Sequence, residues 1–531
     1  MLRPHVRPVI LGIATLGAGM LGLAFLMSLP DVLRSGIGPV RFSHFSVEEA
    51  RAINGFIGRG LNQLLAATFL TIAVAVPLTA NMYSVKFLDF FLKDPVNAGV
   101  LGLVVFAAFE NAWAAYLIRD GFVPTFALQI AFGLLLLCAA AFLPYIYYVF
   151  RFLHPNTLLR RLEQQFEDAL AAALRRPEQL ASERARVAEA LEHIGNIAIR
   201  SVDRSDRSTA LESVATVERL ARTYWGVKER LPDAWFQAEP QLFLSFSSEA
   251  VEEFSANRSW VEMKLFSQLR LVLGVAVPRF HDLASRAAKA LRRLGLEPQA
   301  SEDPTLREAV TEFFNTFVRM TLVGRDARSA FTVFGQYRRY AEGLNATHPS
   351  LTMEIAFYFS YYGRIAREMG LTFVAEAVAH DIGRLVRCAW EAGTPNRKQL
   401  LDRFLDFDAD AQPPLVGANK AHAILASYFL LRGLREPAAL IRERLCSLPP
   451  DILGRLRREL PRVRREKYWE VNERRMNMEY VAPEQREILR WFLEDLAPGD
   501  SGMTWPVSSV RPAALGPAPG PPAPGPATPG S

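Results

Sequence analysis

The sequence predicts an all-α protein: a four-helix transmembrane bundle, then a large α-helical cytoplasmic region, then a disordered tail. Three observations predict this class. Four long apolar runs occupy the first 155 residues, an amphipathic period of 3.6 begins at Asn156, and the chain after Leu496 is mostly Pro, Ala and Gly. We therefore expect a transmembrane domain over 1–155, a helical region over 156–498 and a tail over 499–531.

Each apolar run holds about 20 residues, enough to cross a hydrocarbon core of about 30 Å at 1.5 Å per residue. The first run follows two arginines, as a signal peptide would, but it is longer than the apolar core of a cleaved signal. We expect an uncleaved first helix and keep the cleaved signal as the alternative. The expected spans are Pro8–Leu29, Leu64–Met82, Ala98–Ile118 and Thr125–Val149.

A capping box precedes the second span. Ser46 is followed three residues later by Glu49, and apolar residues then recur at helical spacing. We expect a short amphipathic helix over 46–60, lying at the membrane surface ahead of the span. A tight turn at Arg119–Pro124 should connect the third span to the fourth.

Basic residues set the expected orientation. Arg3 and Arg7 precede the first span, Lys86 and Lys93 lie between the second and third, and Arg151 follows the fourth. Four spans place all of them on one side, and the cytoplasmic side of a membrane carries the excess of Lys and Arg. The Arg- and Ala-rich composition is typical of a bacterial source. We therefore expect a multi-pass protein of the bacterial inner membrane with both termini in the cytoplasm, although the loop after the first span also carries arginines.

The region after Asn156 reads as a series of amphipathic helices. One strand signal, at Gln241–Phe246, is ambiguous. A faint repeat aligns Asp206 with Asp326 at an offset of 120, which suits stacked helix pairs but also arises by chance in Ala- and Arg-rich helices. After a first helix with its apolar face at Leu158–Leu174, the predicted helices are Ser182–Val202, Ser208–Glu229, Trp260–Leu273, Asp282–Leu294, Thr305–Leu322, Ala327–Leu344, Leu351–Met369, Phe373–Ala392, Arg397–Phe407, Ala421–Leu434, Pro437–Cys446, Lys467–Asn477 and Pro483–Leu496.

Two segments carry a family resemblance. The connector Ser84–Asp94 between the second and third spans matches a Ser-Pro-x-Leu-Leu-x-x-Phe-Leu-x-Asp type element, and Ile197–Ala221 is similar to a helix–loop–helix that follows the membrane part. Together the stretch of about Val47–Ala221 resembles the bacterial membrane proteins called domain of unknown function 2254. In this chain Asp203–Arg207 stands where that family usually has Asn-Asp-Pro. The resemblance implies four spans and a cytoplasmic remainder, and it implies no activity, because the family's function is unassigned.

Glu110, with Asn111 beside it, is the sharpest candidate for a functional residue. A charged side chain near the middle of a span costs about 2.5–3.5 kcal/mol by insertion scales, so such residues commonly serve ion or proton movement. The alternative is structural: Glu110 is protonated, or it is hydrogen-bonded to Asn62, Thr71 or Thr79.

Prolines inside two spans are candidate helix kinks, at Pro77 and Pro144. The most basic stretch is Arg455–Arg475, which predicts attraction to anionic lipid or, alternatively, a solvated and salt-bridged helix face. No recognised nucleic-acid module accompanies this charge. The candidate lipid contacts are Arg455, Arg457, Arg458, Arg462, Arg464 and Arg465.

Motifs for catalysis are missing. The dyads His281-Asp282 and His380-Asp381 resemble the metal-binding dyad of helical phosphohydrolases, but no spacing singles out further ligands. The aromatic run Phe357–Tyr362 predicts core packing or, alternatively, a binding groove. There is no Walker A, GxSxG or HExxH sequence, so no catalytic residue, cofactor or metal is predicted.

The expected function is therefore that of a membrane-anchored interaction or scaffolding protein whose helical region docks a protein partner. The alternative is an ion channel, a transporter or its regulatory subunit, with Glu110 in the path. A helical hydrolase that uses the His-Asp dyads is a third hypothesis. The expected partners are the lipid bilayer and a protein; a homo-oligomer stays open, and nucleic acid is not expected.

Overall fold

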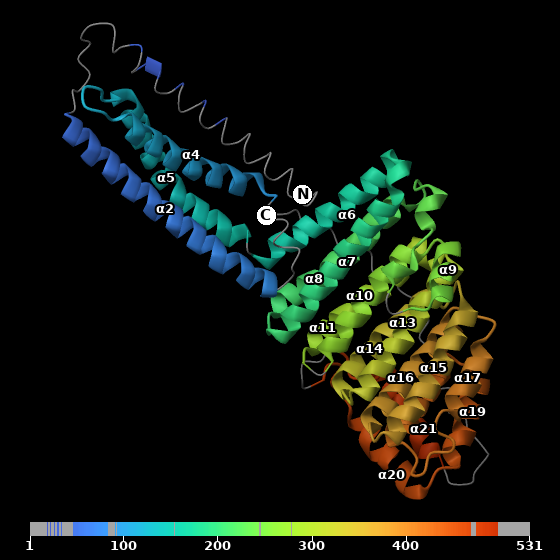
Figure 1. Ribbon diagram of the computed structural model, residues 1–531. Helices are drawn as coiled ribbons and strands as arrows, with labels where there is room; N and C mark the ends of the chain where they lie inside the picture. Colours follow the sequence, from blue (N-terminus) through green and yellow to red (C-terminus); the bar gives the residue numbers. More distant parts are fainter. Residues whose placement is uncertain are drawn as a thin grey trace. The chain divides into compact units, whose positions relative to one another are not determined.

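The computed structural model describes residues 46–82, 91, 93–152, 154–243, 246–277, 279–468 and 474–496, with isolated positions between 19 and 33; the side chains of 75–82 and 177 are not described. Regular structure in these residues is helical, and the one β pairing is a bridge between Arg119 and Phe122. The all-α class is confirmed for this part of the chain (Figure 1). The tail after Leu496 lies outside it.

The chain divides into two compact units. The first, the membrane unit, comprises Met1–Asp168 and Glu192–Arg204, and the second, the helical unit, comprises Ala169–Leu191 and Ser205–Ser531. Two of the three divisions fall inside α6 (Pro155–Arg175) and α7 (Leu180–Asp203), and the third follows α7.

Three helices of the membrane unit are long and apolar enough to cross a bilayer: α2 (Val47–Met82), α4 (Pro95–Leu117) and α5 (Thr125–Phe152). They lie side by side, and each packs against the other two (Figure 1). In the described residues the number of candidate spans is thus three, not the four expected. The remaining expected span, Pro8–Leu29, falls outside the described residues except at isolated positions.

The predicted surface helix over 46–60 is wrong as a separate element, because α2 runs without interruption from Val47 to Met82. Nothing between the two predicted segments ends a helix: Leu61, Asn62 and Gln63 are all compatible with one. The predicted capping box is confirmed. The Ser46 amide donates to Glu49 Oε2 at 2.8 Å, and the Glu49 amide donates to Ser46 Oγ at 3.2 Å.

The predicted turn between the last two spans is also confirmed. Arg119 and Phe122 exchange two backbone hydrogen bonds, of 3.1 and 3.0 Å. Gly121 adopts a φ of 96° inside this turn, a conformation that glycine tolerates because it has no Cβ.

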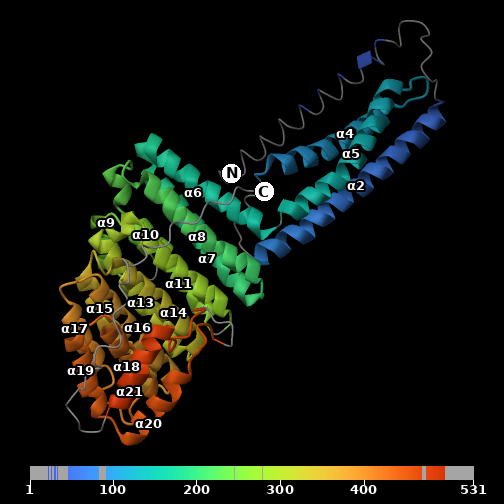
Figure 2. The same ribbon diagram turned by 180° about the vertical axis from the view of Figure 1, so that it is seen from behind.

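Most of the helical unit consists of two rows of helices, with successive members of each row in contact (Figure 2). Helices of one row also pack against partners in the other, so the unit is a stack of helix pairs, an arrangement typical of α-solenoids. The first row is α8 (Arg207–Lys228), α11 (His281–Gly295), α14 (Ala327–Leu344), α16 (Thr372–Glu391), α18 (Val416–Leu431) and α21 (Pro483–Asp495). The second row is α9 (Ser248–Ala256), α10 (Trp260–Ala276), α13 (Pro304–Val323), α15 (Pro349–Glu368), α17 (Arg397–Asp406) and α19 (Arg435–Cys446).

The residues aligned by the repeat begin two helices of the first row in the same way. Asp206 accepts from the Thr209 amide at the start of α8, and Asp326 accepts from the Ser329 amide at the start of α14, both at 3.1 Å. The residue before each aspartate has a positive φ, 62° at Ser205 and 51° at Arg325. An aspartate at the N-cap satisfies amides that have no partner within the helix.

One prediction for the helical unit is wrong. The segment Lys467–Asn477 was expected to be a helix, but its described ends are not helical, and 469–473 lie outside the described residues. The ambiguous strand signal at Gln241–Phe246 corresponds to no strand in its described part, where a 3₁₀ turn covers Pro240–Leu242; residues 244 and 245 lie outside the described residues. The short helices α9 and α20 (Pro450–Glu459) were not anticipated. The remaining short elements are α12 (Pro298–Ser301) and the 3₁₀ turns Pro177–Gln179, Asp233–Phe236 and Leu460–Arg462.

Candidate functional site

Glu110 lies on the face of α4 that packs against α2 and α5. It follows Ala107 by one turn, and Ala107 belongs to the apolar cluster that also includes Ile57 and Leu135. Its side chain is fully buried, and neither carboxylate oxygen has a hydrogen-bond partner within the described residues. A carboxyl group with no partner is costly in such surroundings.

The neighbours suggested for Glu110 by the sequence do not reach it. Asn62 is exposed, and the Thr71 hydroxyl donates instead to the Ala67 carbonyl at 2.9 Å. The Thr79 side chain is outside the described residues. Asn111 is buried beside Glu110, and its amide nitrogen lies so close to Gly58 that a Cβ there would be 3.0 Å away. The lack of a side chain at Gly58 therefore lets α2 approach α4.

The two prolines proposed as kinks lie within continuous helices. Pro144 is inside α5, and Pro77 is inside α2, where its side chain is not described. Whether either proline bends its helix stays a prediction.

Asp94, which ends the connector that resembles the family element, organises one end of the membrane unit. It caps α4 by accepting from the amides of Val96 and Asn97, and it accepts from Tyr148 at 2.9 Å and from Arg161 at 2.9 Å. Burial favours the neutral acid, but the hydrogen bonds from Arg161 and Tyr148 outweigh it and hold the pKa of Asp94 below its usual value. Asp94 thus fastens α4, α5 and α6 together.

The arginines proposed to contact lipid fall into two groups. Arg455 pairs with Glu459 at 3.1 Å, and Arg457 donates to the carbonyls of Leu493, at 2.9 Å, and Leu496 at the end of α21. The remaining four are exposed and make no hydrogen bond or ion pair with the described residues, so lipid contact stays a prediction for them: Arg458, Arg462, Arg464 and Arg465.

The His-Asp dyads do not form metal sites among the described residues, which hold no group of three or more potential ligands. Asp282 forms an ion pair with Arg207, and His281 Nδ1 lies 3.2 Å from Asp326 Oδ2. The second dyad lies in an arginine-lined cavity, where Asp381 forms ion pairs with Arg338 and Arg474.

The aromatic run at Phe357–Tyr362 divides between the core and the surface of α15. Phe359 is fully buried and packs edge-on against Phe334 and Tyr337. Phe357 and Tyr361 are about half exposed. Core packing therefore explains Phe359 and leaves the two outer rings unassigned.

The arginine cavity lies among α14, α16, α18, α21 and the segment 474–480, and it has a volume of about 370 Å³. Five arginines and two carboxylates line it, a surplus of three positive charges: Arg338, Arg339, Arg384, Arg387, Arg474, Glu342 and Asp381. Burial, with Lys420 and Arg474 nearby, lowers the pKa of His380 in this cavity to about 4, so its imidazole is neutral at physiological pH.

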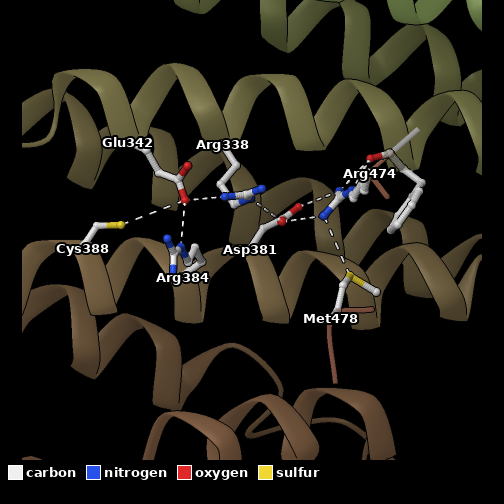
Figure 3. A network of polar contacts seen from close by, with 8 residues as sticks. Arg338, Glu342, Asp381, Arg384, Cys388, Arg474 and Met478 are labelled. Atoms are coloured by element: carbon white, nitrogen blue, oxygen red, sulfur yellow. Dashed lines mark hydrogen bonds and ion pairs between the residues drawn. The ribbon is translucent and has the colours of Figure 1, made fainter. Parts of the chain in front are cut away.

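Asp381 holds two of these arginines in place (Figure 3). Arg474 donates to its two oxygens at 2.6 and 2.8 Å, and Arg338 Nε lies 2.9 Å from the first of them. Arg474 also donates to the Phe331 carbonyl and stacks its guanidinium 3.9 Å from the centre of the Phe331 ring. The side chain passes so close to Gly335 that a Cβ there would meet Arg474 Nε at 2.9 Å.

Glu342 forms the second junction of the network. It accepts from Arg338 and from Arg384, the latter at 3.2 Å, and the Cys388 sulfur lies 4.0 Å from the same oxygen (Figure 3). Burial and Glu342 raise the pKa of the Cys388 thiol to about 11, so it is protonated at neutral pH and a poor nucleophile.

A basic cluster on the first row surrounds Glu218 of α8. Glu218 pairs with Arg222, Arg286 and Arg293 at 2.9, 2.8 and 3.3 Å. These contacts outweigh burial and keep the pKa of Glu218 below its usual value. The cluster comprises Arg222, Arg286, Lys289, Arg292, Arg293 and Arg339.

Positive charge in this cluster exceeds what the carboxylates neutralise. Lys289 and Arg339 make no ion pair with any described residue. Burial and the neighbouring arginines lower the pKa values of Lys289, Arg292 and Arg339. The arrangement is a cationic surface with unneutralised charge.

Sequence reasoning missed both the arginine cavity and the basic cluster. The sequence held a local signal for part of the arginine cavity, namely oppositely charged residues four positions apart on one helix, which commonly form ion pairs. Such pairs are Arg338 with Glu342 and Arg387 with Glu391. Arg474 could not be placed this way, because it lies 93 residues from Asp381.

Comparisons with known proteins bear on the first part of the chain. The family model described as "Predicted membrane protein (DUF2254)" matches residues 5–211, which confirms the resemblance drawn from the connector and the later helix–loop–helix. With three apolar helices, this match supports a membrane protein. No curated protein sequence matches the chain.

One solved structure is similar at a low level. It is described as "Circular tandem repeat protein with novel repeat topology and enhanced subunit contact surfaces", is 14% identical, and has a TM-score of 0.33 over 85% of this chain and 96% of that chain. A likeness this weak carries no argument about fold or function.

Proposed function

We propose that this protein is a membrane-anchored adaptor whose helical unit docks an acidic segment of a protein partner. The observation that carries the proposal is the unneutralised charge of the basic cluster. Lys289 and Arg339 are partly buried cations with no ion pair in the described residues, and cations in that condition gain free energy when an anion joins them.

The stacked helix pairs support this role. Consecutive helices of the first row supply the cluster, since Glu218 and Arg222 come from α8, Arg286 and Arg293 from α11, and Arg339 from α14. Stacked pairs create extended surfaces suited to an extended peptide. A binding role requires no catalytic group, and we propose binding without catalysis.

The test uses the full chain in a nonionic detergent and a fluorescent oligoglutamate peptide as the probe. The change is Lys289→Glu with Arg293→Glu, and the matched control is Arg319→Glu with Arg364→Glu, two exposed arginines on the second row. At about 1 kcal/mol or more for each reversed charge, the first pair should weaken anisotropy-detected binding about tenfold or more. Equal weakening by both pairs would show that only net charge matters and would refute the docking site.

A second experiment addresses the partner in cells. A photo-crosslinking residue at position 289 should capture a protein through an acidic segment, while the same residue at position 319 should not. Captured segments without excess Asp and Glu would contradict the proposal.

A second candidate function is ion or proton movement through the membrane unit. It rests on Glu110, which is fully buried among three apolar helices with both oxygens unpartnered in the described residues. Proteoliposomes holding the full chain should show a proton flux that Glu110→Gln abolishes. A flux that survives this change, or none at all in the unaltered protein, would remove the candidate.

We also propose the bacterial inner membrane as the location, with the helical unit in the cytoplasm. Basic residues around the spans support this orientation. A reporter fused after Gly121 should give a periplasmic signal, and one fused after Leu496 should give a cytoplasmic signal. A periplasmic signal after Leu496 would contradict this orientation.

A further inference from the structure

The arginine cavity contains hydrogen-bond donors that no acceptor in the described residues uses. Arg339 makes no hydrogen bond there. Arg384 and Arg387 each donate through Nε alone, at 3.2 Å to Glu342 and at 2.8 Å to Glu391. The terminal nitrogens of these guanidinium groups are therefore available to a bound molecule.

Two of the three groups are held in position without a ligand. Glu342 fixes Arg384 and also accepts from Arg338, which in turn pairs with Asp381. The Arg387 guanidinium is fixed by Glu391 and lies 4.3 Å from the centre of the Tyr428 ring. Donors fixed in advance lose little conformational entropy on binding.

The charge of the cavity selects the kind of anion. Its five arginines exceed its two lining carboxylates by three, and the surplus is two when Glu391, which pairs with Arg387, is counted as well. A carboxylate ligand would neutralise one of these charges, whereas a phosphate monoester carries about −1.5 to −2 and presents three acceptor oxygens. Arginine also matches phosphate geometry through paired N–H donors.

The volume of the cavity, about 370 Å³, is in the range of small-molecule sites and leaves room beyond a phosphate group. Apolar side chains contribute to the same lining, among them Ile424, Leu425 and Met478. They would accommodate an apolar or aromatic body attached to the phosphate. His380 is neutral and adds a hydrogen-bonding group without adding charge.

We propose that the arginine cavity binds a small organic phosphate monoester, with the phosphate on Arg339, Arg384 and Arg387 and the body against the apolar lining. The cavity shares Arg339 with the basic cluster, but the inference does not depend on the protein partner proposed above, because Arg384 and Arg387 belong to the cavity and not to the cluster. The phosphate could come from a soluble metabolite or from a lipid headgroup, and the two sources share the same chemistry.

The experiment measures binding of phenyl phosphate to the full chain in nonionic detergent by equilibrium dialysis. Benzoate is the control with a singly charged anionic group, and benzyl alcohol is the control with an aromatic ring and no charge. Phenyl phosphate should bind about tenfold or more tightly than benzoate, and benzyl alcohol should not bind. Competition by glucose 6-phosphate would identify a soluble source, and competition by short-chain phosphatidate would identify a lipid source.

Variants locate the site. Arg384→Gln with Arg387→Gln should weaken phenyl phosphate binding about tenfold or more. Replacing both arginines by Lys should weaken binding less, because lysine keeps the positive charge and loses only the paired N–H donors of the guanidinium group. Arg319→Gln with Arg364→Gln is the control, and thermal unfolding of each variant checks that it is folded. Binding no tighter than that of benzoate, or binding unchanged by the Gln pair, overturns the proposal. Lys289→Glu with Arg293→Glu should leave phenyl phosphate binding intact, so this test fails or succeeds separately from the oligoglutamate test.

Discussion

The two units of this protein each bury a carboxylate, and they do so in opposite ways. In the membrane unit Glu110 lies among apolar helices with both oxygens unpartnered in the described residues. In the helical unit Asp381 lies between Arg338 and Arg474, which supply donors at 2.6 to 2.9 Å. The first carboxylate is isolated, and the second is embedded in a network.

The two units also differ in how many large apolar side chains they expose. The membrane helices expose large apolar side chains such as Leu70, Leu143 and Tyr147, each about two-thirds exposed or more, as suits contact with lipid. The largest fully buried side chains lie mainly in the helical unit, among them Trp235, Trp260 and Tyr337. In the helical unit, buried side chains therefore mark the hydrophobic core. In the membrane unit, apolar side chains are common on the surface, so the informative buried residues are polar ones such as Glu110.

The largest expected effect comes from removing the paired carboxylate. Asp381→Asn leaves the buried Arg474 without its counter-ion and leaves Arg338 with Glu342 alone, and it should destabilise the helical unit by about 3–5 kcal/mol. Glu110→Gln removes no hydrogen bond found in the described residues and should change the stability of the membrane unit by less than about 1 kcal/mol. Hydrogen exchange read separately in α16 and α4 measures both effects.

The contrast would fail if Glu110→Gln proved the more destabilising change. That result would mean that Glu110 has a partner outside the described residues, such as the segment Pro8–Leu29.

The next largest effect is a pH dependence of the helical unit. The pKa of His380 is about 4 in the folded protein, below its unfolded value near 6.5, because burial and the positive charges of Lys420 and Arg474 outweigh Asp381. Between these two values the unfolded chain binds a proton that the folded chain does not. Stability should therefore fall as the pH falls from 6.5 to 4, by about 3 kcal/mol at most.

His380→Gln should remove this part of the pH dependence, measured as the unfolding free energy in urea at each pH. Asp94 in the membrane unit provides the comparison. Its folded pKa is lowered, so its contribution is present above the unfolded value of 3.8 and is lost only as the pH falls through the folded value. Identical pH profiles for the unaltered protein and His380→Gln would contradict the assignment.

A smaller effect tests whether the network tolerates displacement. Gly335→Ala places a Cβ 2.9 Å from Arg474 Nε, and Arg474 cannot move freely because Asp381 and the Phe331 carbonyl hold it. We expect a loss of about 1–3 kcal/mol in the unfolding free energy. Gly226→Ala in α8 is the matched control, since no heavy atom lies within 4 Å of its Cβ, and it should stabilise by about 0.5–1 kcal/mol.

The smallest effect concerns the membrane unit. Ser46→Ala removes the cap at the start of α2 and should cost about 1 kcal/mol. It should appear as faster hydrogen exchange confined to the first turn of α2. Glu48→Gln leaves the capping box intact and serves as the control. Faster exchange throughout α2 would show that the cap supports the whole helix.

Local patterns were sufficient for much of the fold. The predicted helix Ala327–Leu344 agrees with α14 at both ends, and the capping box at Ser46 and the turn after Ile118 were also found. These features depend on hydrogen bonds and side-chain periodicity within a few residues. The separation of 46–60 from the second span was an error of the same local kind, because a change from amphipathic to apolar composition does not end a helix.

By itself the sequence determined that this is a helical protein with apolar spans near its start, since helix formation and transfer into lipid depend on residues close together in the chain. Only the tertiary structure decided which charges are isolated and which are paired. Arg474 reaches Asp381 across 93 positions because the non-helical segment 474–480 packs against α14 and α16, and Glu110 lies apart from any described partner because α2 and α5 enclose it with apolar side chains. Such pairing depends on the packing of distant helices, which no local pattern encodes.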